Sequence, residues 1–181
     1  MTTTSITHRV SAFFGTFLAC SAIAFAQHTD LQTGKEPANA LVQEVREATK
    51  QYLDVNNAVA AGYAPFLGCV SGSDHGAMGV HYVNGKLLNG TVDVRNPQAL
   101  IYEPLANGQM RLVGVEYIAF ASIWLQNNSG PPVLDGQVFL FVDSPNRFNI
   151  PAFFELHVWA WRDNPKGSFV DWNDHVSCAH G

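Results

Sequence analysis

Four side chains able to do acid–base or metal chemistry lie within short, otherwise apolar segments of the sequence: His81, Glu103, Glu116 and His157. Such a side chain in an apolar setting needs a partner, because burying an unpaired polar or charged group costs free energy. Two histidines and one carboxylate also form a ligand set that binds Fe(II), Mn or Zn while leaving coordination positions open. We therefore treat these four residues as a candidate site.

The alternation of side chains along a strand indicates which of them share a face. In residues 110–119, the face that holds Glu116 is otherwise apolar. In residues 153–162, His157 shares its face with one acid and three large aromatic residues: Phe153, Glu155, Trp159 and Trp161. If these strands curl around one cavity together with the strands of the other two candidates, we expect the polar groups to converge in an aromatic-lined pocket.

Two kinds of chemistry fit such a pocket, which would bind a small molecule. With a metal, His81, Glu116 and His157 are the expected ligands of one divalent ion (Zn, Fe, Mn or Cu), which acts as a Lewis acid or a redox centre. Without a metal, Glu116 or Glu103 is the base and His157 the acid in proton transfer on a planar or aromatic substrate. Both versions describe an enzyme.

Two interpretations without catalysis stay open. In the first, Glu116 pairs with Arg111 or Arg162 and belongs to a purely structural network. In the second, the pocket is that of a carrier for a hydrophobic or planar ligand, with tryptophans as its stacking wall. The alternative, favoured for Trp159 or Trp161, is that the tryptophans are core residues; three of the four lie in the last quarter of the chain, and the role of Trp172 stays open.

The elements that must position these residues follow from hydrophobic periodicity. Apolar residues recur every three or four positions from Leu41 to Val59, which predicts one amphipathic helix that begins near Pro37 and ends before Gly62. Beyond it, turn pairs such as Asn84-Gly85 separate runs rich in Val, Ile, Phe, Tyr and Trp. The predicted strands are 79–84, 99–104, 110–119, 137–142 and 153–162, with a short helix near 120–125. One helix followed by an antiparallel meander predicts an α+β fold, with the helix packed on a small antiparallel β-barrel or strongly curled sheet.

Composition limits what the chain can be. Its 181 residues are 47% hydrophobic and 14% charged, with 10 Lys and Arg against 15 Asp and Glu, which gives a net charge of −5. This excludes a disordered tail and a coiled coil, and it favours one packed domain. A protein that wraps nucleic acid needs clustered basic residues, and the sequence has no basic run. We expect a small-molecule ligand and no nucleic-acid partner, and the oligomeric state stays open.

The N-terminal sequence predicts export. Residues 1–26 have a basic start, an apolar stretch and a small-x-small end at Ala24-Phe25-Ala26, which is typical of a signal peptide. Residues 27–36 form a polar spacer, and 37–181 form the single globular domain. We expect a periplasmic or secreted protein, with no membrane association unless Cys20 is lipidated at an alternative lipoprotein cleavage box.

The two cysteines that remain after cleavage are Cys69 and Cys178. In an oxidising compartment an even number of cysteines favours a disulfide, which here would close a loop of about 110 residues. The alternative is two buried free thiols.

Several segments together resemble a group of small exported bacterial proteins of unassigned function. The clearest are Gly76-Ala77-Met78-Gly79-Val80-His81-Tyr82-Val83-Asn84, Val115-Glu116-Tyr117 and Leu156-His157-Val158-Trp159, followed by Asn164-Pro165-x-Gly167-x-Phe169 and Val176-Ser177-Cys178. The resemblance implies export and kinship, and it assigns no catalytic residue.

Overall fold

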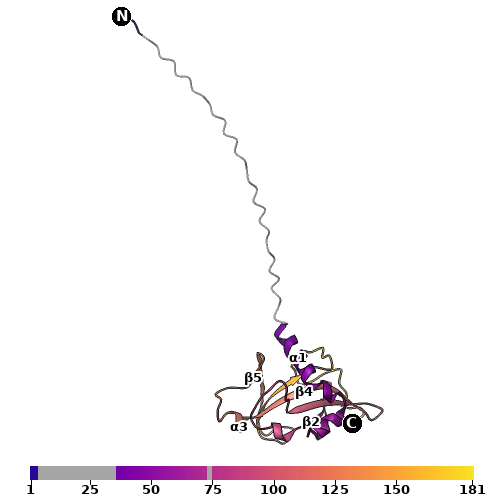
Figure 1. Ribbon diagram of the computed structural model, residues 1–181. Coiled ribbons are helices and arrows are strands. Elements are labelled where there is room, and N and C mark those ends of the chain that lie inside the picture. The colour runs from indigo at the N-terminus through magenta and orange to yellow at the C-terminus, as the bar shows by residue number, and fades with distance from the viewer. Residues whose placement is uncertain (4–35, 73–74) are drawn as a thin grey trace. The chain divides into compact units, whose positions relative to one another are not determined.

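The computed structural model describes residues 1–3, 36–72 and 75–181 of the chain, and the folded part begins at Glu36 (Figure 1). The predicted signal peptide and spacer lie outside the described residues, except for residues 1–3 and Glu36. Among the described residues, three helical segments precede the first strand: α1 (Glu36–Thr49), the 3-10 helix η1 (Lys50–Leu53) and α2 (Val55–Ala60). The helix predicted as continuous from Pro37 to Val59 is therefore interrupted.

The interruption lies at Asp54. Its backbone is extended (φ −91°, ψ 114°), and its side chain accepts a hydrogen bond from the backbone N–H of Asn56, which caps α2. The break rotates α2 relative to the apolar face predicted for one continuous helix. Ala58 is therefore buried while Val59 is 54% exposed. Leu41, in the first half, is fully buried as expected.

Eight strands and two further short helices follow. Their bounds are β1 (Ala64–Ser71), β2 (Ala77–Val83), η2 (Gly85–Leu87), β3 (Ala99–Pro104), β4 (Met110–Phe120), α3 (Ala121–Trp124), β5 (Val133–Leu134), β6 (Gln137–Val138), β7 (Leu140–Val142) and β8 (Phe153–Val158). Six of the strands form one antiparallel sheet in the order β1-β2-β3-β4-β8-β7. This sheet curls into a half-barrel (Figure 1). The α+β prediction with a curled sheet is confirmed, and β5 and β6 form a separate hairpin.

Two predicted strands end or divide early. The strand predicted over 137–142 is split at Phe139, which is buried and donates its backbone N–H to Pro132 rather than to the sheet. The strand predicted over 153–162 ends at Val158 because the chain turns there: the N–H of Ala160 bonds the carbonyl of Val158. The edge strand β1 was not predicted, since it is mostly exposed and its apolar residues do not alternate with polar ones.

The two faces of the sheet have different roles. One face packs on the helices and carries the main core, which includes Leu41, Val45, Ala58, Leu100, Tyr102, Val115, Tyr117, Leu156 and Val158. Because side chains alternate along each strand, the intervening residues of β3, β4 and β8 point to the other face. That face carries the candidate site.

Cys69 of β1 and Cys178 near the C-terminus are joined by a disulfide, with their Cα atoms 5.6 Å apart. The predicted pairing is confirmed, and a disulfide fits an exported protein. No helix within the described ranges is long and apolar enough to cross a membrane.

Candidate metal centre

Strand register brings three of the predicted residues together. Glu116 on β4 lies directly opposite His157 on β8, and on its other side it lies opposite Ala99 of β3. Ala99 in turn faces Val83 of β2, and His81 is two residues before Val83 on the same face. His81 itself lies opposite Ile101, so its ring meets Glu116 diagonally across β3, beside the small side chain of Ala99.

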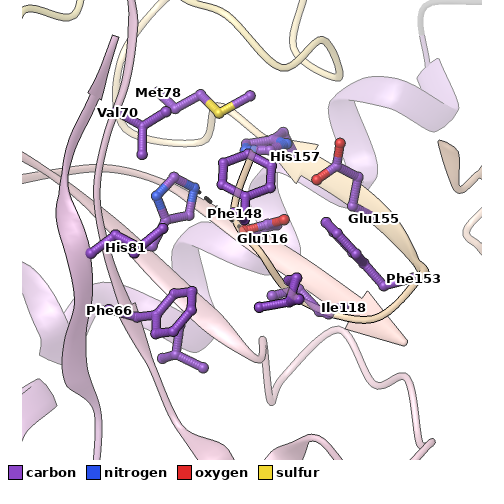
Figure 2. A pocket seen from close by; sticks show the side chains of 13 residues that line it. Phe66, Val70, Met78, His81, Glu116, Ile118, Phe148, Phe153, Glu155 and His157 are labelled. Carbon is purple, nitrogen blue, oxygen red and sulfur yellow. Dashed lines mark ion pairs between the residues drawn. The ribbon is translucent and has the colours of Figure 1, made fainter. Parts of the chain in front are cut away.

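The resulting contacts are short (Figure 2). The Nε2 atom of His81 lies 3.3 Å from Oε2 of Glu116, and the rings of His81 and His157 are perpendicular with centroids 5.8 Å apart. One potential ligand atom from each residue lies within 4.8 Å of those of the other two. Ligands of one zinc ion lie about 2.0–2.2 Å from it, so side-chain movements of about 1 Å suffice to enclose an ion.

Burial controls the charge of this cluster. The side chains of His81, Glu116 and His157 are 10%, 6% and 1% exposed. Burial lowers the pKa of His81 to about 4, although a hydrogen bond with the backbone of Gly79 opposes the shift. Burial and then the nearby His81 lower the pKa of His157 well below its ordinary value. Both imidazoles are therefore neutral near pH 7 and keep a lone pair for a metal.

The acid of the cluster has no basic side chain beside it. Among the described residues, no Lys or Arg nitrogen lies within 4.0 Å of the Glu116 carboxylate. Burial raises its pKa well above the ordinary value, and the neighbouring Glu155 raises it further. Without a cation, burial therefore favours the protonated form of this carboxyl group, whereas a divalent ion would favour its charged form.

Two further acids, outside the four candidate residues, complete the site. Glu155 lies on the same face of β8 as His157, hydrogen-bonds Glu116, and has its pKa raised by burial to about 7. Asp171, in the segment after β8, places Oδ1 3.6 Å from Nδ1 of His157. The alternation of side chains along β8 indicates from the sequence that Glu155 lies on the same face as His157. No sequence pattern indicates the position of Asp171, because it follows a loop whose path the sequence does not reveal.

His157 is the point where two possible ligand groups overlap. Besides the first group, Glu155, His157 and Asp171 also have ligand atoms within 4.8 Å of one another. Both ring nitrogens of His157 and Oδ1 of Asp171 are buried and, within the described part of the chain, have no hydrogen-bond partner. We call these the three unpaired atoms. Unpaired buried polar atoms are uncommon in proteins, so their presence at this point requires a physical reason.

An apolar pocket opens over the polar cluster. Its cavity volume is about 40 Å³, measured as the space that the centre of a water-sized sphere can reach, which is room for a few water molecules. Besides the polar residues, its lining consists of Phe66, Leu67, Val70, Met78, Val83, Ile118, Phe148, Ile150 and Phe153. Phe66 and Leu67 of the edge strand β1 are 41% and 50% exposed. The site thus combines a polar interior with apolar walls, as small-molecule sites do.

Glu103 requires a correction, because it does not line this pocket. Its carboxylate accepts hydrogen bonds from the Arg111 guanidinium and, at 3.0 Å, from the backbone N–H of Ser177. A register shift between Ile101 and Tyr102 moves the end of β3 relative to β4 and sets Glu103 opposite Arg111. The predicted role of Glu103 as a base in the shared pocket therefore has no geometric support.

Trp159 and Trp161 belong to the core, as favoured from the sequence, and do not form a stacking wall. Trp159 is buried, stacks on His157 with centroids 6.1 Å apart, and donates Nε1–H to the carbonyl of Val170. Trp161 donates to the hydroxyl of Thr49 and packs against the main core. Among the described residues, phenylalanines rather than tryptophans line the pocket.

Comparisons of the chain with protein-family models, with curated proteins and with solved structures found no match.

Proposed function

We propose that the protein is an exported enzyme that binds one divalent metal ion through His81, Glu116 and His157 and acts on a small, largely apolar molecule. The ion acts as a Lewis acid for an oxygen of the substrate or for a bound water. Three protein ligands leave coordination positions open for that partner. The disulfide and the signal-like residues 1–26 support export to the periplasm or the medium.

One observation carries the proposal. Two neutral imidazoles and a carboxyl group from three different strands converge in a buried site, and His157 has no hydrogen-bond partner among the described residues for either ring nitrogen. A structural histidine would normally bond the backbone or another side chain. Coordination of an ion gives one of these nitrogens a partner and supplies the positive charge that Glu116 lacks.

Metal content of the purified protein tests the proposal. We expect the wild-type protein, after dialysis against a weak chelator and titration with Zn²⁺, to bind one ion per chain. His81→Gln is expected to weaken that binding at least 100-fold. His175→Gln is the matched control, because His175 is exposed and lies outside the pocket. A wild-type protein that binds no Zn²⁺, Mn²⁺, Fe²⁺ or Cu²⁺ would contradict the proposal.

A carrier for a hydrophobic ligand is the second candidate, favoured by the exposed Phe66 and Leu67 at the pocket. An apolar fluorescent probe distinguishes the two. For an enzyme with a metal at the base of the pocket, we expect Zn²⁺ to change the probe's affinity. In a metal-free carrier, the probe binds equally well with and without the ion.

A further inference from the structure

We infer that Asp171 is a positioning residue for the metal centre: it accepts a hydrogen bond from Nδ1–H of His157 and so directs Nε2 of that ring to the ion. This inference rests on the proposed metal site and adds to it a residue on a separate segment of the chain.

The three unpaired atoms, both ring nitrogens of His157 and Oδ1 of Asp171, can all gain a partner from one hydrogen bond and one metal bond. A neutral imidazole carries one N–H and one lone pair, so its two nitrogens need one acceptor and one electrophile. Oδ1 of Asp171 lies 3.6 Å from Nδ1 of His157, and Glu116 lies opposite His157 on the neighbouring strand. One hydrogen bond to Asp171 and one bond from Nε2 to a metal would give all three atoms a partner.

The 3.6 Å between Nδ1 of His157 and Oδ1 of Asp171 is slightly too long for a hydrogen bond. A hydrogen bond between nitrogen and oxygen is about 2.7–3.2 Å long, so the two groups must approach by about half an ångström. A metal bound at Nε2 withdraws electron density from the ring and makes the Nδ1–H a stronger donor. Histidines that bind metals almost always donate their other N–H to a carboxylate, a carbonyl or a water, which fixes the ring and its tautomer.

The chain around Asp171 is held on both sides. The carbonyl of Val170, just before it, accepts a hydrogen bond from the Trp159 indole, and the carbonyl of Trp172, just after it, accepts one from the Asn164 amide. The backbone of Asp171 is thus fixed near His157. The carboxylate is only 27% exposed. Its position beside the ring therefore follows from the fold, and only the approach of about half an ångström remains to be made when a metal binds.

Calorimetric titration with Zn²⁺ tests this role. We expect Asp171→Asn to weaken Zn²⁺ binding about 10- to 100-fold, which is the usual effect of losing such a partner. Asp174→Asn is the control, because Asp174 lies on the same segment but pairs with Lys166 at the surface; its affinity should equal that of the wild type. Thermal unfolding without metal should be similar for both variants, since a merely structural role would lower the melting temperature of Asp171→Asn instead.

A measurement on the unmodified chain keeps the inference testable even if Asp171→Asn does not fold. Long-range ¹H–¹⁵N spectra of the Zn²⁺-bound wild type should show His157 protonated at Nδ1 and coordinated at Nε2. Coordination through Nδ1, or equal Zn²⁺ affinity in Asp171→Asn and wild type, overturns the inference and leaves the metal site standing. If the wild type binds no ion, both proposals are wrong.

Discussion

Replacing Glu116 with Gln separates a metal ligand from a structural ion-pair partner, because it keeps the volume of the side chain and removes its charge. Without metal, burial favours the uncharged forms of both Glu116 and His81, so the 3.3 Å contact between them is one of neutral polar groups. A contact of this kind contributes about 1 kcal/mol, and the amide of Gln can take the place of the carboxyl group in it. We therefore expect the melting temperature of the metal-free variant to change by no more than about 4 °C.

With metal, the two proteins should differ clearly. An ion present at about 100 times its Kd stabilises the folded wild type by about 2.7 kcal/mol. For a chain of this size, each kcal/mol raises the melting temperature by about 2–4 °C, so the wild type should gain about 5–11 °C. Glu116→Gln lacks the anionic ligand and should gain less than about 2 °C at the same ion concentration.

Differential scanning calorimetry, with and without Zn²⁺, measures both effects. If His81 and Glu116 instead form a charged pair in the metal-free protein, breaking it costs about 3–5 kcal/mol, and the metal-free variant should melt at least about 6 °C below the wild type. That result, or an equal gain from Zn²⁺ in both proteins, would show that Glu116 is not the anionic ligand of a metal.

Three further predictions concern other parts of the chain. Reduction of the Cys69–Cys178 disulfide, whose cysteines are 109 residues apart, should lower the free energy of unfolding by about 4–5 kcal/mol in urea titrations; an unchanged midpoint would show that the bond adds no stability. Intact-mass analysis of the exported protein should find a chain that begins at Gln27, and a lipid-modified mass beginning at Cys20 would contradict the predicted signal peptide. Gly79→Ala should destabilise the fold by at least about 1 kcal/mol and weaken Zn²⁺ binding, because φ of Gly79 is +98° and the added Cβ would lie 2.7 Å from the Tyr102 carbonyl oxygen; a melting temperature equal to that of the wild type would oppose this.

The parts of the fold that follow from local patterns could be predicted from the sequence. β3 was predicted with its observed bounds, because its run of apolar residues ends at Pro104. Glu116 and His157 were placed on the inner face because a period of two needs no knowledge of distant segments. The break at Asp54 also has a local cause, an aspartate whose side chain can cap the next helix, but the strong apolar repeat on both sides conceals it.

The parts that depend on register or on loop paths could not be predicted. Glu103 shares a strand face with Ile101, yet the register shift after Ile101 places Arg111 opposite Glu103. Asp171 reaches His157 only because the segment after β8 folds back, where hydrogen bonds from Trp159 and Asn164 hold the residues on both sides of Asp171. No pattern of neighbouring residues encodes such a contact.

The three proposed ligands come from β2, β4 and β8, and dozens of residues separate each from the next. Pairings between such distant segments form slowly, and β8 joins the sheet only after the chain has passed β5, β6 and β7. An unfolded chain offers no two of these ligands close together, as a helical motif with neighbouring histidines would. The ion should therefore have little affinity for unfolded or partly folded protein. Metal binding would then follow folding. Because the ion binds only the folded protein, its binding would raise the free energy of unfolding by the full amount.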